Sequence, residues 1–220
     1  MPADLRGRFQ ALWTRAVGPV GIDEAWRALD AGYGGAARHY HDWRHVAALL
    51  DGHDAVRPHA SFAGPVHDAI DLAIVFHDAI YDPARPDNEA RSAALLRTCA
   101  GTAADPDLLS RSEAMIRATA DHAPQADPAV RLMLDLDLAI LGAPRPDYET
   151  YAAAIRREYA AVPDPVWRVG RALVLERFLA RPHLYQTDLF RERFEAGARA
   201  NLAAEAAALR AEPDGTGRGA

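Results

Sequence analysis

The sequence predicts an all-α protein, a helical bundle in a single domain that spans residues 1–212. Half of its 220 residues are apolar, and clusters of β-branched residues are few, which favours helices. Apolar residues recur with helical spacing between breakers of proline and glycine, and no segment shows the alternation typical of a strand. A chain of this length forms one domain with a sizeable core.

Ten segments of the chain are predicted to be helical. In the first, Phe9, Leu12 and Trp13 fall on one face, and Asp23 is placed to cap the second. An apolar run that starts at Ile70 marks the fourth as a buried helix. The ten segments are residues 5–17, 24–31, 45–56, 66–81, 89–100, 108–120, 129–141, 147–159, 165–179 and 188–211.

The composition narrows the classes of function. The formal net charge of −6 argues against a binder of duplex nucleic acid, which needs a basic face. A single cysteine, Cys99, excludes an intramolecular disulfide and a cysteine-based zinc site, and its helical setting predicts a buried thiol. The lack of a signal peptide and of any run of about 18 apolar residues predicts a cytoplasmic protein with no membrane partner. Residues 213–220 are predicted to be a disordered tail, and the oligomeric state is left open, a homodimer included.

The most informative motif is the adjacent pair His77-Asp78 near the end of the apolar run. Neighbours on a helix diverge by about 100°, so both side chains can reach one metal ion only near a helix end or by a bidentate-like approach across a shared axis. The break at residues 82–83, Asp-Pro, is consistent with such an end. The pair is therefore a candidate for metal binding.

Two further pairs of polar residues stand on either side of this motif. His41 and His45 are four residues apart and share a face if both are helical, although His41 could lie just outside the helix. Asp135 and Asp137 diverge by about 200° on a helix, so only one of them can face a site. A carboxylate among the leucines around Asp137 is costly unless it is paired or ligated. A divalent cation would satisfy several such groups at once.

This order of residues on successive helices resembles the HD superfamily of metal-dependent phosphohydrolases, and more closely the bacterial family of predicted HD-type phosphohydrolases. The resemblance covers residues 5–210. The segments that carry it are 40–46 (YHDWRHV), 76–82 (FHDAIYD), 87–93 (DNEARSA), 134–142 (LDLDLAILG), 148–151 (YETY), 155–159 (IRREY) and 198–202 (ARANL). It implies an all-helical fold in which His45, His77, Asp78 and Asp137 bind one divalent metal ion.

The resemblance also implies roles for other residues. Its spacing favours His45 as the first ligand, which leaves His41 to contact the substrate. Asp78 is expected to be catalytic, and Glu89 to transfer a proton or orient the substrate, because HD proteins often carry a site residue in that region. Arginine suits a phosphate through its paired donors. The expected substrate contacts are His41, Arg44, Asn88, His122 and Arg156.

The expected function is hydrolysis of a small phosphorylated molecule, a nucleotide or a phosphomonoester, by metal-activated water. Two imidazoles and two carboxylates suit Mn²⁺, Fe²⁺, Co²⁺, Ni²⁺ or Zn²⁺, with Mg²⁺ also compatible. One alternative is a non-catalytic protein that binds a metal and a ligand. Another is a di-iron oxygenase, for which only His41 and His122 are spare. His53, His59 and His67 lack such a context and are expected at the surface or in loops.

Overall fold

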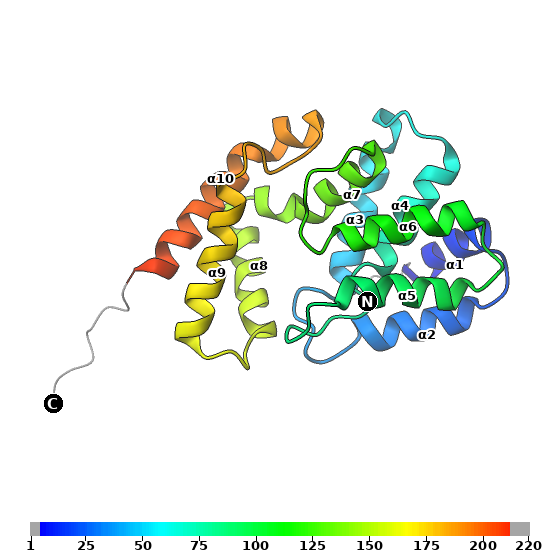
Figure 1. Ribbon diagram of the computed structural model, residues 1–220, viewed down its shortest axis with the longest axis horizontal. Helices are drawn as coiled ribbons and strands as arrows, with labels where there is room; N and C mark the ends of the chain where they lie inside the picture. Colours follow the sequence, from blue (N-terminus) through cyan, green and yellow to red (C-terminus); the bar gives the residue numbers. More distant parts are fainter. Residues whose placement is uncertain (1–4, 212–220) are drawn as a thin grey trace. The chain divides into compact units, whose positions relative to one another are not determined.

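A computed structural model describes residues 5–211 of the chain (Figure 1). These residues form ten α-helices and two short 3₁₀ helices, with no strand among them, which confirms the all-α prediction. Contacts between residues group the described chain into two compact units, residues 5–137 and 138–211, and the domain bounds 1–212 stay a prediction. None of the described helices is long and apolar enough to cross a membrane. The tail predicted at residues 213–220 lies outside the described residues.

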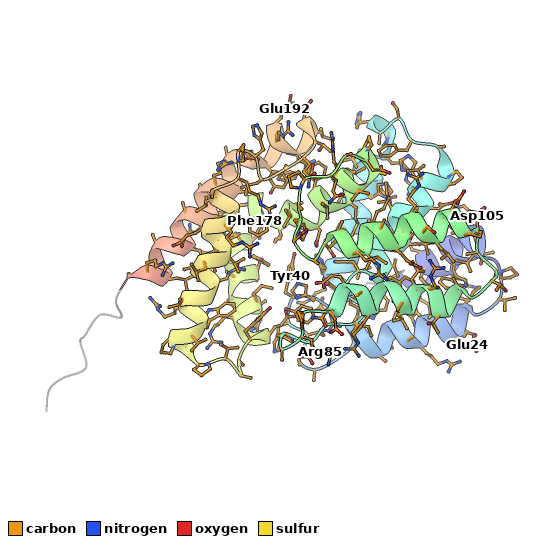
Figure 2. All side chains as sticks on the ribbon, in the orientation of Figure 1. Glu24, Tyr40, Arg85, Asp105, Phe178 and Glu192 are labelled. Atoms are coloured by element: carbon orange, nitrogen blue, oxygen red, sulfur yellow. The ribbon has the colours of Figure 1, made fainter. Side chains whose placement is uncertain are left out.

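The first unit is built around one central helix. Its helices are α1 (Leu5–Ala16), α2 (Ile22–Tyr33), α3 (Trp43–Val56), η1 (Arg57–His59), α4 (Gly64–Phe76), α5 (Asn88–Ala100), α6 (Pro106–Ala118) and α7 (Pro128–Leu138), the last of which ends at the boundary with the second unit. Helix α4 packs against α1, α3, α5 and α6, and every residue from Ala69 to Phe76 is buried. Charged residues such as Glu24 and Asp105 are exposed at the periphery (Figure 2). The apolar run, interrupted only by Asp71, is thus the core of this unit, as expected for a helix that is apolar on nearly all sides.

Caps in the first unit set where the helices begin. The carboxylate of Asp42 accepts a hydrogen bond from the backbone N–H of Arg44 at 2.8 Å, so Asp42 is the N-cap of α3. We predicted Asp23 as the N-cap of α2, but Gly21 occupies that position with a φ of +77°, and Asp23 lies in the first turn. A negative charge there still interacts favourably with the helix dipole.

The second unit comprises η2 (Ala139–Gly142), α8 (Arg145–Glu158), α9 (Asp164–Leu179) and α10 (Asp188–Arg210). Helix α10 packs against both α9 and η2. A Cβ atom at Gly142 would lie 2.6 Å from the Cβ of Phe194, so only glycine permits this approach of η2 to α10. Glu205 of α10 accepts hydrogen bonds from Tyr148 of α8 and from Arg171 of α9, the latter at 2.9 Å, and so links the three helices.

Candidate metal centre

The pair His77-Asp78 lies at a helix end, but earlier than predicted. We expected the helix to continue to residue 81; it ends at Phe76, with His77 as its C-cap. The backbone N–H of Ile80 does not continue the hydrogen bonds of the helix. It donates instead to the hydroxyl of Ser92 on α5, at 3.0 Å. This early end lets both adjacent side chains turn to the same side, and Asp78 Oδ2 lies 3.0 Å from His77 Nε2.

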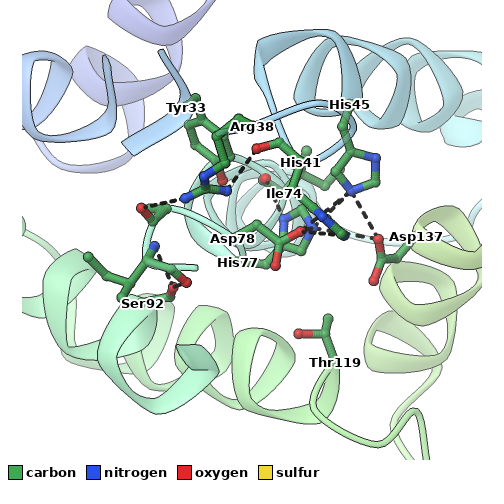
Figure 3. A network of polar contacts seen from close by, with 12 residues as sticks. Tyr33, Arg38, His41, His45, Ile74, His77, Asp78, Ser92, Thr119 and Asp137 are labelled. Atoms are coloured by element: carbon green, nitrogen blue, oxygen red, sulfur yellow. Dashed lines mark hydrogen bonds and ion pairs between the residues drawn. The ribbon is translucent and has the colours of Figure 1, made fainter. Parts of the chain in front are cut away.

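Four side chains from α3, the end of α4 and α7 converge there (Figure 3). The Nε2 atoms of His45 and His77 are 3.1 Å apart. Asp137 Oδ1 lies 3.1 Å from His45 Nε2 and 3.5 Å from His77 Nε2, and Asp78 Oδ2 is 3.8 Å from His45 Nε2. One ligand atom from each of His45, His77 and Asp137 lies within 4.8 Å of the others, a spacing that could hold a metal ion. The structure therefore brings together all four residues that the resemblance implied as ligands.

In each of the two pairs that the residue pattern left open, the structure shows which member joins the cluster. His45 joins the cluster and His41 flanks it, because Asp42 caps α3 and places His41 just before the helix. On α7, Asp137 faces the cluster. Asp135, which helical geometry directs away from Asp137, is fully buried.

The two imidazoles lie at the base of the cluster and the two carboxylates at its mouth. The side chains of His45 and His77 are 2% and 1% exposed, whereas those of Asp78 and Asp137 are each 14% exposed. His77 Nδ1 lies 2.9 Å from the carbonyl oxygen of Ile74, and it must be the donor because a carbonyl only accepts. A neutral His77 therefore presents the lone pair of Nε2 to the cluster, which is how backbone carbonyls orient metal-binding histidines.

The ionisable groups of the cluster shift one another's pKa values. Burial disfavours the imidazolium form of His77, yet Asp78 and Asp137 outweigh it and raise the pKa of His77 well above its usual value. Burial likewise opposes ionisation of the two carboxylates, but His77 and the other histidines lower the pKa of Asp78 and of Asp137. Burial lowers the pKa of His45. A cation is thus favoured between these groups, and two nitrogens with two carboxylates fit a first-row divalent ion.

Two further histidines flank the mouth. His41 Nε2 lies 3.9 Å from Asp78 Oδ2, and His122 Nε2 lies 2.9 Å from Asp137 Oδ2. The backbone of His122 has a φ of +49°, the one positive φ outside glycine among residues 5–211, a conformation that costs on the order of 1 kcal/mol. The surrounding structure therefore holds His122 in place beside Asp137 against local strain.

The arginines predicted to contact substrate have other partners. The guanidinium of Arg44 is exposed and paired with Asp42, with its Nε and Nη2 atoms 2.9 and 2.7 Å from Oδ2. Arg156 belongs to the second unit, where it donates to the carbonyls of Tyr159 and Val162. Neither set of contacts involves the cluster, so a substrate contact of either arginine stays a prediction.

Asn88 and Glu89 begin α5. The side-chain oxygen of Asn88 accepts from the N–H of Asp82, and its amide group donates to the carbonyls of Asp82 and Arg85. Asn88 thus orders the loop that follows the His-Asp pair, a role that we did not predict. Glu89 forms no hydrogen bond or ion pair with any residue in the described part of the chain. Its part in proton transfer likewise remains a prediction.

Arg38 was not among the predicted site residues, yet the structure places it beside the cluster (Figure 3). Its guanidinium donates from Nη1 to the carbonyl of His41 at 2.7 Å and from Nη2 to the carbonyl of Ala79 at 3.3 Å. The only signal in the sequence is that Arg38 lies three residues before His41. That signal is weak because the chain has many arginines.

A second buried polar cluster lies between α3 and α4. We expected His53, His59 and His67 at the surface or in loops, which is wrong for His53 and His67, both buried. His53 Nδ1 donates to Asp71 at 2.6 Å, and His53 Nε2 lies 3.0 Å from His67 Nδ1. Arg57 donates to the other oxygen of Asp71 at 2.6 Å. The interruption of the apolar run by Asp71 could have indicated a buried carboxylate that needs such partners.

Comparisons with protein-family models, with curated proteins and with solved structures found no match to this chain. The site itself is thus the basis for a functional assignment.

Proposed function

We propose that the protein is a metal-dependent phosphohydrolase that acts on a nucleotide or another small phosphomonoester. The observation that supports this proposal most is the convergence of two buried imidazole nitrogens with two partly exposed carboxylates. His45, His77, Asp78 and Asp137 would hold one divalent ion. An ion bound there would lower the pKa of coordinated water toward neutrality and polarise a phosphoryl oxygen.

The chain's own groups have complementary roles in this proposal. The ion pairs of Asp78 with three histidines run through Oδ2, so Oδ1 would be the atom to accept a hydrogen bond from the attacking water. His41 and His122 have side chains that are 18% and 12% exposed beside the carboxylates. The Nε2 atom of His41 is suited to give a proton to the leaving oxygen, whereas that of His122, 2.9 Å from Asp137 Oδ2, is suited to hold this carboxylate in place.

The test combines metal content with phosphate release. Protein purified without chelator or histidine tag is expected to contain one metal ion per chain. It is expected to release phosphate from some members of a panel of nucleotides and phosphomonoesters when Mn²⁺, Co²⁺ or Ni²⁺ is added. Asp78→Asn and Asp137→Asn remove ligands and should abolish both properties. Asp107→Asn and His59→Asn, at exposed positions, serve as matched controls and should retain both.

Other results of the metal and phosphate-release measurements would count against the proposed hydrolase. Wild-type protein without metal, or an Asp78→Asn variant with full turnover, would contradict the proposal. Bound metal without turnover on the panel would favour a binding role. Two irons per chain together with oxygen consumption would favour the oxygenase.

A further inference from the structure

We propose that Arg38 is a positioning residue that holds His41 at the mouth of the metal centre, beside Asp78. The inference rests on the proposed function for its chemistry, since His41 acts only if the centre binds a phosphorylated ligand. The placement of His41 itself can be measured without metal or substrate.

The guanidinium of Arg38 links two segments that carry site residues. One donor binds the carbonyl of His41, just before α3, and another binds the carbonyl of Ala79, just after Asp78. The base of the side chain is also held, because the backbone N–H of Arg38 donates to the carbonyl of Gly35 at 3.0 Å. A single side chain therefore sets how far His41 lies from the turn that contains Asp78.

Aromatic rings complete this arrangement. The Cζ atom of Arg38 lies 5.5 Å from the ring centroid of Tyr33 and 5.1 Å from that of Tyr81, within the range of cation–π contacts. Tyr33 is anchored by its hydroxyl, which donates to the carbonyl of Val75 at 2.9 Å. The ring of Tyr81 in turn lies 4.3 Å from the ring of His41. Loss of the guanidinium would remove its hydrogen bond to the carbonyl of His41 and its contact with Tyr81, the ring that lies against His41.

The chemistry of the contacts requires arginine in particular. Its planar group presents several donors in fixed directions, whereas a lysine ammonium cannot bridge two carbonyls with the same geometry. Among the described residues Arg38 forms no ion pair, while Arg44, six residues later, is paired with Asp42. The guanidinium of Arg38 thus makes its contacts with two carbonyls and two rings, and not with a carboxylate.

The first measurement follows the His41 ring in the full, metal-free chain by proton–carbon NMR, with its signals assigned from their loss in His41→Asn. Contact with Tyr81 should give these signals a large ring-current shift in the wild type. We expect Arg38→Gln to abolish that shift, Arg38→Lys to retain part of it and Arg44→Gln to leave it unchanged. Should Arg38→Gln fail to fold, Arg38→Lys provides the comparison.

The second measurement is calorimetry of inorganic phosphate with the Mn²⁺-loaded protein. Arg38→Gln and His41→Asn should each weaken phosphate binding by about tenfold, the effect of one hydrogen bond. The double variant should lose no more than either single one, because the two residues act through one contact. Affinity for Mn²⁺ should not change, since none of the four ligands is altered.

Two results would overturn the role of Arg38: an Arg38→Gln variant that keeps the shifted His41 signals, or losses that add in the double variant. A wild-type chain that binds no metal would instead defeat the proposed function, and the NMR comparison would still decide whether Arg38 places His41.

Discussion

Asp71 shows how one charged side chain is stabilised inside the first unit. Its carboxylate accepts hydrogen bonds from His53 and Arg57, both at 2.6 Å. Burial by itself raises the pKa of Asp71, but the hydrogen bonds and charges of His53 and Arg57 outweigh burial and lower it. The pKa in the folded chain is thus below that in the unfolded chain. The ionised carboxylate therefore contributes stability that is complete above the unfolded pKa of about 3.9 and is lost as the pH falls through the folded value.

We predict that Asp71→Asn lowers the free energy of unfolding by about 3 kcal/mol at pH 7, because asparagine offers one acceptor oxygen to two donors and removes the negative charge that faces Arg57. The difference from wild type should shrink as the pH falls below about 3.9, where the carboxyl group of the unfolded chain takes up a proton before that of the folded chain. Urea unfolding between pH 3 and pH 7 measures both effects. Asp51→Asn, at an exposed position, is the control and should change stability little. A difference that stayed constant across this range would argue against ionisation as the source of the stability.

At the scale of helices, α2 approaches the turn after α4 closely enough to exclude any side chain. A Cβ atom at Gly32 would lie 2.3 Å from the carbonyl oxygen of Ala79, next to Asp78. Gly170 in α9 is the opposite case, because it is exposed in mid-helix and a Cβ atom there would meet nothing within 4 Å. The same substitution should therefore have opposite effects in the two helices.

Gly32→Ala should destabilise the protein by about 1–3 kcal/mol, because backbone must move to admit the methyl group. It should also weaken metal binding, since the displaced turn carries a ligand. Gly170→Ala should stabilise the protein by about 0.5–1 kcal/mol through the helix propensity of alanine. Urea unfolding and metal titration of both variants test these expectations. Equal stability of Gly32→Ala and wild type would show that α2 can withdraw from the turn without cost.

At the scale of the whole molecule, the proposed ligands come from three places far apart in the chain, all within the first unit. The unfolded chain cannot bring them together, so an ion that binds the folded form stabilises it. We predict a higher melting temperature with added Mn²⁺ or Co²⁺, with a gain of about 2.7 kcal/mol when the ion is at 100 times its Kd.

This gain should reverse with chelator, disappear in His45→Asn and persist in His59→Asn, which changes an exposed histidine. Differential scanning calorimetry measures it. The same rise in His45→Asn and wild type would place the bound ion elsewhere.

Local rules in the sequence determined the helices. Nine of the ten predicted segments match observed helices closely, because apolar spacing and caps act over a few residues. The exception is the end of α4, where Ser92, twelve residues beyond Ile80, takes the backbone donor that would have continued the helix. Contacts of this range leave no periodic signal.

The sequence by itself also determined which residue types could bind a metal, and its resemblance named the four that the structure brings together. Only the tertiary structure decided that Asp137 faces the site and Asp135 does not, that His53 is buried against Asp71, and that Arg38 reaches both His41 and Ala79. These contacts depend on how helices pack, and packing is set by the whole set of side chains between them, not by the spacing of residues along one segment.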